Sequence, residues 1–174
     1  MVNINGKASN FAEIVDVYIR NAFYYEKPVV VCVGSGKTSG WDSLAPLVGT
    51  LLEEEFKIDA YVYGTLREPI HPMSLVSVIE EIRKKFGCRK ILTINASLGK
   101  TEDVGFFKFS TEGLLPGKNK IVEDFKKDCG DFNIFAVVDE WVLGVSIYKS
   151  VMARVWEMAR VLSGAIAVSI NSKV

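Results

Sequence analysis

The stretch KPVVVCVGSGKTSGWDSLAPLVGT, which runs from Lys27 to Thr50, decides the fold. Its apolar run VVVCV shows no alternation with polar residues, which is typical of a strand buried on both faces of a parallel sheet. A turn rich in glycine and serine follows, and Asp42 stands where the next helix should begin. The stretch therefore predicts a strand–loop–helix unit, on which α/β proteins commonly build a ligand site at the carboxyl end of a strand.

Helical and strand patterns alternate outward from this unit. Apolar residues recur at helical spacing over 9–25, 42–56, 71–86 and 142–162, with Ser9 or Asn10 as candidate cap of the first helix. Further strands are expected at 58–63, 90–94, 104–109 and 132–138, the second of them ending at Asn95 before a loop over 96–103. We expect a turn at 114–120, and the C-terminal AIAVSI forms either a helix tail or a short edge strand.

This order of elements predicts a single domain over residues 1–174, an α/β fold built as a three-layer α/β/α sandwich around a mostly parallel sheet. Lys plus Arg and Asp plus Glu number 21 each, so the formal net charge is zero. No basic excess favours nucleic acid as a partner, and we expect none. The neutral balance does little to oppose self-association, so a homo-oligomer stays open.

The termini and the cysteines indicate the compartment. The N-terminal MVNINGKASN lacks the apolar core of a signal peptide, and AIAVSI is too short to span a bilayer. Cys32, Cys88 and Cys129 are far apart and odd in number, which argues against a disulfide framework. We therefore expect a cytoplasmic protein without a membrane partner.

The sequence GSGKT, which begins at Gly34, is similar to part of a nucleotide-binding P-loop. A complete P-loop needs a glycine at position 31, where Val31 lies inside the strand. The next buried strand ends in Asn95 rather than in the aspartate that such sites use for a metal ion. The sequence thus argues against nucleotide hydrolysis, and the loop is instead a candidate for binding an anion or a backbone carbonyl through its N–H groups.

Three further positions are candidate site residues, and each also has a simpler structural interpretation. Asp42 is either a carboxylate at the ligand-binding edge or a helix-capping acid. His71, the only histidine, is either a ligand or acid–base group, or a cap for the helix that Pro72 begins. Asn95 either contacts a ligand or forms a turn. A lone histidine predicts no metal site, and Ser97 lacks the G-x-S-x-G context of a hydrolase nucleophile.

Four blocks, in order, resemble the YyaC-type sporulation proteins. They are DSLAPLVG from Asp42, with Ala45 where the family usually has glycine, VYGTLREPIHPMSL at 62–75, INASLGK at 94–100 and LLPGKNK at 114–120. The resemblance spans about residues 28–165. That family is similar to the germination proteases of spore-forming bacteria and, more distantly, to hydrogenase maturation endopeptidases. The resemblance therefore implies their phosphorylase/hydrolase-like α/β/α fold.

The resemblance also implies a pair of acidic residues, of which this chain keeps one. Two aspartates act together in the germination proteases; the first maps onto Asp42 and the second onto Asn95. An asparagine has the shape and the N–H donor of a protonated carboxyl group but cannot exchange a proton, so Asp103 or Glu102 would have to supply a second acid. In the maturation endopeptidases the equivalent acids help bind nickel with a later histidine. No histidine follows His71, so no metal ligand set is carried over.

The function implied is that of a sporulation-associated peptidase that needs no cofactor and acts on a peptide or protein, such as a small spore protein. Asp42 would activate water, and Asn95 would orient the substrate carbonyl. The residues expected to contact the substrate are Gly34, Ser35, Gly36, His71 and Ser97. Asn95 also motivates an alternative, a silent peptide- or protein-binding member of the same fold. A peptidyl-tRNA hydrolase or nucleoside phosphorylase activity is a third, more distant possibility.

Overall fold

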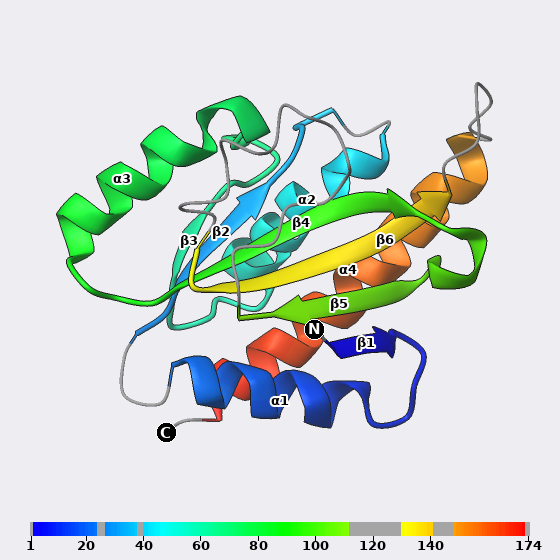
Figure 1. Ribbon diagram of the computed structural model, residues 1–174, viewed down its shortest axis with the longest axis horizontal. Helices are drawn as coiled ribbons and strands as arrows, with labels where there is room; N and C mark the ends of the chain where they lie inside the picture. Colours follow the sequence, from blue (N-terminus) through cyan, green and yellow to red (C-terminus); the bar gives the residue numbers. More distant parts are fainter. Residues whose placement is uncertain (1, 24–26, 38–39, 112–129, 141–147, 173–174) are drawn as a thin grey trace.

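The computed structural model describes residues 2–23, 27–37, 40–111, 130–140 and 148–172. Six strands form one sheet in the order β1-β5-β6-β4-β2-β3 (Figure 1). The strands are β1 Val2–Asn5, β2 Val29–Val33, β3 Tyr61–Tyr63, β4 Ile91–Gly99, β5 Phe106–Ser110 and β6 Phe132–Glu140. The α-helices are α1 Phe11–Ala22, α2 Leu44–Thr50, α3 Leu75–Phe86 and α4 Tyr148–Asn171. β5 runs antiparallel to both of its neighbours, and the other ladders are parallel.

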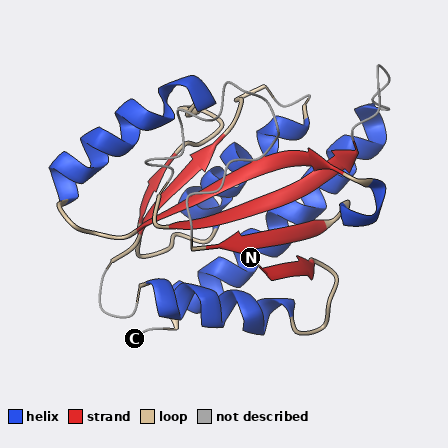
Figure 2. Ribbon diagram, in the orientation of Figure 1, coloured by secondary structure: helices blue, strands red, loops and turns tan. Residues whose placement is uncertain are grey.

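Helices cover both faces of the sheet (Figure 2), which confirms the predicted α/β/α fold. α1, α2 and α4 pack on one face, against Val30 and Cys32 of β2 and the matching residues of β4 and β6. α3 packs on the other face, against Val29, Val31 and Val33. β2 is therefore buried on both faces, which is the physical reason for its continuous apolar run.

The helix predicted over 42–56 is present but changes its pitch along its length. A 3₁₀ turn, η1 Trp41–Ser43, leads into α2, and a π-turn, η2 Leu51–Glu55, follows it. Pro46 lies in the first turn of α2, as predicted, where its missing N–H breaks no helical hydrogen bond. A Cβ atom on Gly49 would lie 2.3 Å from the carbonyl oxygen of Gly64, so α2 lies very close to the end of β3.

The structure adds one strand, extends another, and places one of the two cap candidates of the first helix. β1 was not predicted, because only Ile4 of this four-residue edge strand is buried and the apolar pattern is correspondingly weak. β4 continues to Gly99 instead of ending at Asn95, since β6 still pairs with it after β2 has ended. Asn10 occupies the N-cap of α1 without a side-chain capping hydrogen bond.

Two other expectations concern the C-terminal half. The segment AIAVSI forms the end of α4, so of the two alternatives the helix tail is confirmed. The predicted turn at 114–120 and the predicted helix start at 142–147 lie outside the described residues. Across the described ranges, no helix combines the length and apolarity needed to cross a bilayer.

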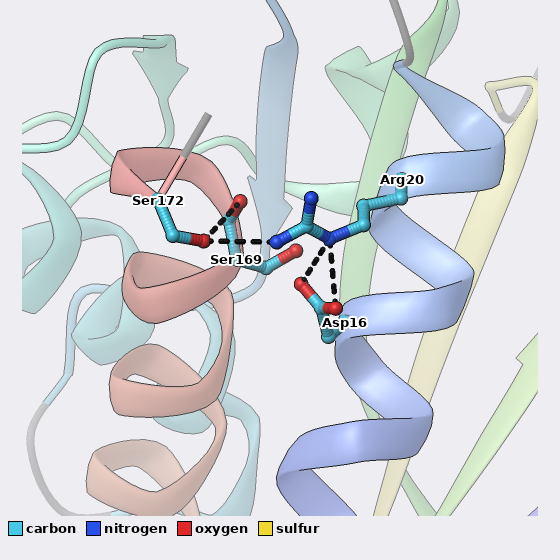
Figure 3. Close-up of polar contacts among 4 residues, drawn as sticks. All are labelled: Asp16, Arg20, Ser169 and Ser172. Carbon is cyan, nitrogen blue, oxygen red and sulfur yellow. Dashed lines mark hydrogen bonds and ion pairs between the residues drawn. The ribbon is translucent and has the colours of Figure 1, made fainter. Parts of the chain in front are cut away.

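α1 and α4 lie side by side and are joined by polar contacts near the C-terminal end of α4 (Figure 3). Arg20 Nε donates to Asp16 Oδ1 at 2.8 Å and to Asp16 Oδ2 at 2.7 Å. The Nη2 atom of Arg20 donates to Ser172 Oγ at 3.1 Å. A guanidinium group at this position is favoured by the negative end of the α4 dipole. Arg20 thus joins an element from the start of the chain to one from its end.

Candidate functional site

The carboxyl ends of β2 and β4 form the topological switch point of the sheet. From β2 the chain continues to β3 on one side, and from β4 it continues to β5 and β6 on the other. The helix after β2 lies on one face, whereas α3, which precedes β4, lies on the other. Open α/β sheets bind ligands in the crevice at such a point. The carboxyl end of the β2–β4 pair is therefore the candidate functional site.

Hydrogen bonds hold Asp42 at this edge of the sheet. The Ser35 N–H donates to the carbonyl oxygen of Asp42 at 3.1 Å, so η1 folds back on the end of β2. A Cβ atom at Gly34 would lie 2.1 Å from the same carbonyl oxygen, so only glycine permits this close approach. In the turn itself, the Ser43 hydroxyl donates to the Gly40 carbonyl oxygen at 2.7 Å. Asp42 is half-buried within this turn.

The glycine-rich loop uses part of its donor capacity internally. The Gly34 N–H donates to the carbonyl oxygen of Ile70 at 2.9 Å, and the Ser35 N–H is taken by Asp42. The N–H of Gly36 has no acceptor among the described residues. Of the three loop N–H groups expected to bind substrate, the one of Gly36 is therefore the donor left for a ligand.

Asn95 lies where β2 ends. It pairs with Val33, the last residue of β2, and is half-buried. Because successive side chains of a strand alternate between the faces, Asn95 and Ser97 both point to the α3 side of the sheet, as Val33 does. η1 and β4 are also in contact, which brings the segments that carry Asp42 and Asn95 to one edge. The catalytic pairing of these two side chains stays a prediction.

His71 has a structural contact at the start of the helix that follows it. Its Nδ1 atom accepts a hydrogen bond from the Met73 N–H at 3.4 Å, where the 3₁₀ turn Pro72–Ser74 begins, and its side chain is exposed. This contact supports the interpretation of His71 as a helix cap. The preceding residue, Ile70, accepts a hydrogen bond from Gly34 of the glycine-rich loop, so His71 follows directly after a residue that contacts this loop. Its role in substrate binding stays a prediction.

The two acids considered as replacements for the missing aspartate have partners elsewhere. Asp103 Oδ2 lies 2.7 Å from Lys108 Nζ on β5, and Glu102 lies 3.6 Å from Lys100. β5 is separated from β4 by β6 in the sheet. The pair with Lys108 thus directs Asp103 away from the β2–β4 edge.

Two carboxylates at this edge were missed by sequence reasoning. Asp139 and Glu140 end β6 and pair with Leu98 and Gly99 of β4. The predicted strand stopped at residue 138, although two acids directly after a buried strand are a signal of the same kind as Asp42. Asp139 lies 3.4 Å from Arg154, and Glu140 accepts a hydrogen bond from the Thr101 hydroxyl. In the part of the chain that is described, no three His, Cys, Asp or Glu residues are grouped to hold a metal ion.

A cavity of about 670 Å³ adjoins the glycine-rich loop on the β3 side. Its walls come from β3, the loop 64–70, η2 and α3. A Cβ atom on Gly36 would lie 3.0 Å from the Leu66 carbonyl oxygen and equally far from Pro69 Cγ. The loop that lines this cavity is therefore packed directly against the loop of the candidate site.

Comparisons with known proteins show which sequences this chain is similar to. The sequence profile of the family described as "Protein of unknown function (DUF1256)" matches residues 2–165. The uncharacterized protein YyaC of Bacillus subtilis (strain 168) is 34% identical over 111 residues, which are 64% of this chain. That match covers 53% of YyaC, so the chain spans about half the length of this curated relative.

A solved structure shares the fold. The crystal structure of HycI, a [NiFe] hydrogenase maturation protease from Thermococcus kodakarensis KOD1, matches with a TM-score of 0.53. The match covers 88% of this chain and 98% of that one, at 15% sequence identity, so it concerns the fold alone. The resemblance to YyaC-type proteins and the protease-like fold drawn from the sequence are thus confirmed.

Proposed function

We propose that this chain, which belongs to the DUF1256 family, is a peptidase-like protein that binds a peptide or protein segment at the switch point between β2 and β4. The observation that carries the proposal is the hydrogen bond from the Ser35 N–H to Asp42, which keeps an acidic residue at the ligand-binding edge. The protease-like fold supports the same conclusion. The sporulation setting, the cytoplasmic location and small spore proteins as substrates rest on the resemblance and belong to the proposal.

Hydrolysis at this site gives each polar group a defined role. The Asp42 carboxylate takes a proton from water as the water oxygen attacks the scissile carbonyl carbon. The Asn95 side-chain N–H donates to the carbonyl oxygen, on which negative charge develops, and the Gly36 N–H holds the substrate backbone. When the C–N bond breaks, the proton on Asp42 passes to the leaving amine. Because Asn95 cannot transfer a proton, Asp42 performs both proton transfers and turnover is slow.

Incubation of the purified protein with small spore proteins and with unstructured peptides tests this function. We expect slow cleavage that is lost in Asp42→Ala. Asp59→Ala is the matched control. Asp59 is an exposed aspartate that precedes β3, so it lies at the amino ends of the parallel strands, away from the candidate site, and it pairs with Lys27. Equal turnover in Asp42→Ala and in the wild type contradicts the proposal.

Asn95 itself favours a second candidate function, a binding protein that retains the fold without the chemistry. The experiment that separates the two is Asn95→Asp, which restores the second carboxyl group of the implied pair. New or faster cleavage in this variant indicates a decayed enzyme. Absence of cleavage in both forms, with a peptide bound by both, indicates a binding role.

A further inference from the structure

We propose that the open edge of β3 binds an extended peptide segment rich in lysine and arginine by strand addition. The inference rests on the proposed function in taking a peptide as the ligand, and it adds where that peptide binds and which side chains it carries. The cavity of about 670 Å³ along this edge is called the β3 groove. Its polar lining residues include Glu53, Glu54, Arg67, Glu68, Glu81 and Lys85.

The backbone of β3 has a donor and an acceptor available on its outer side. β3 is the last strand of the sheet, and no strand among the described residues pairs with its outer edge. The Tyr61 N–H donates to the Pro28 carbonyl oxygen at 2.9 Å, so the backbone groups of Tyr61 face β2. Because these groups alternate in direction along a strand, the N–H and C=O of Val62 face the open edge. An extended segment can pair with them, as in other complexes formed by strand addition.

The groove is shaped to hold the side chains of such a segment on both faces of the strand. η2 supplies one wall and α3, which includes Ile82, supplies the other, with Val62 and Tyr63 of β3 between them. β3 is only three residues long and half-buried. A short edge flanked by two helical walls admits a single extended segment, whereas a broad sheet-to-sheet contact would meet those walls.

The charged side chains that line the β3 groove indicate which kind of peptide binds there. The groove is lined by four carboxylates and two cationic side chains, so its formal charge is 4 − 2 = 2 negative, although the whole chain is neutral. Arg67 lies 3.4 Å from Glu54, and Lys85 Nζ lies 3.3 Å from the Tyr63 hydroxyl, so both cations already have partners. A second copy of this chain would bring the same negative surface to the edge and be repelled. Lysine and arginine side chains complement it.

The position of the groove connects it to the candidate site. Leu66 and Pro69, in the loop that lines the groove, lie against Gly36, whose N–H has no acceptor among the described residues. β3 runs parallel to β2, so the carboxyl ends of both strands point in the same direction, toward the candidate site. A segment paired with β3 therefore leads its chain toward Asp42, and the groove selects peptides with basic residues beside the bond presented there.

Fluorescence anisotropy with two labelled ten-residue peptides tests the inference; one alternates Lys with Thr and Val, and the other carries Glu in place of Lys. We expect the basic peptide to bind more tightly, by about tenfold or more, and to weaken as salt rises. Val62→Pro removes the outward N–H but keeps the bonds to β2, and it should weaken binding by a similar factor. The double variant Glu68→Lys/Glu81→Lys should also weaken binding of the basic peptide by a similar factor.

Glu80→Lys is the matched control, because Glu80 is exposed on the same helix but does not line the groove; it should change binding less than twofold. Thermal unfolding of each variant checks that the fold is kept. Equal binding of the two peptides, or unchanged binding in Val62→Pro, overturns the inference. So does a wild-type dimer that becomes monomeric in Val62→Pro, since a second copy then fills the edge. Asp42→Ala should bind the basic peptide as the wild type does. If this variant binds the peptide and also cleaves substrate as fast as the wild type, the proposed chemistry alone is contradicted.

Discussion

At the scale of single residues, Tyr18 links α1 to the point where β5 and β6 meet. Its hydroxyl donates to the Ser110 carbonyl oxygen at 2.5 Å and accepts from the Asn133 N–H at 3.1 Å. Burial, partly offset by these hydrogen bonds, raises the pKa of Tyr18 from about 10 to about 12. Because the pKa is higher in the folded state, the contribution of the neutral phenol is complete below pH 10 and is lost as the pH rises through 12.

We expect Tyr18→Phe to lower the free energy of unfolding by about 1–3 kcal/mol at pH 7, because the Ser110 carbonyl and the Asn133 N–H lose a partner. Between pH 10 and 12 the variant should lose less stability than the wild type. Urea unfolding at several pH values measures both effects, with Tyr61→Phe as control because Tyr61 lies at the opposite edge of the sheet. Parallel pH profiles for wild type and Tyr18→Phe contradict this account.

Cys32 is fully buried in β2, and burial raises the pKa of its thiol. The reactive thiolate is therefore disfavoured in the folded protein. In the variant Cys88→Ser/Cys129→Ser, we expect Cys32 to react with a disulfide reagent only as fast as the protein opens. The exposed Cys88, kept in Cys32→Ala/Cys129→Ser, should react at once. Immediate reaction of Cys32 in native buffer excludes the buried position.

At the scale of elements, the packing of α2, β2 and β3 depends on Gly64. Its φ is +84°, and a Cβ atom there would lie 1.9 Å from the Cys32 carbonyl oxygen. Gly87, which ends α3, has a φ of +67° with nothing within 4 Å of such an atom. The two positions thus share a left-handed backbone and differ in the space around it.

This difference predicts unequal costs for the same substitution. Gly87→Ala should lower the free energy of unfolding by about 1–2 kcal/mol, the strain of a left-handed backbone. Gly64→Ala adds a clash with the backbone of β2 and should cost at least about 1–3 kcal/mol more. Chemical denaturation of both variants measures the contrast. Similar values for the two would mean that β3 and β2 are not in this close contact.

The elements also show which features a sequence pattern can and cannot predict. β2 and α3 were predictable because each has an unbroken local signal, a fully apolar run in one and an apolar stripe ending at Gly87 in the other. The end of β4 was not predictable, because Ala96–Gly99 are held in the strand by pairing with β6, some forty residues later. β1 was missed for the same reason, since its partner is β5.

At the scale of the whole molecule, the order of the strands determines the candidate site. Asp42 and Asn95 were predictable as residues at one edge, because parallel strands end at the same side of a sheet. The internal use of the Gly34 and Ser35 N–H groups was not, because it depends on Ile70 and on the backward fold of η1. Asp139 and Glu140 join this edge only because β6 lies beside β4.

The central claim is that the Asp42 carboxylate and the Asn95 side chain meet in one crevice. The most direct test follows the Asn95 side-chain NH₂ resonances in ¹⁵N NMR spectra from pH 7 to pH 3, with Asn95→Asp used to assign them. We predict that these resonances shift over this pH range in the wild type and that Asp42→Asn abolishes the shift. Resonances that titrate identically in the wild type and in Asp42→Asn would contradict the claim.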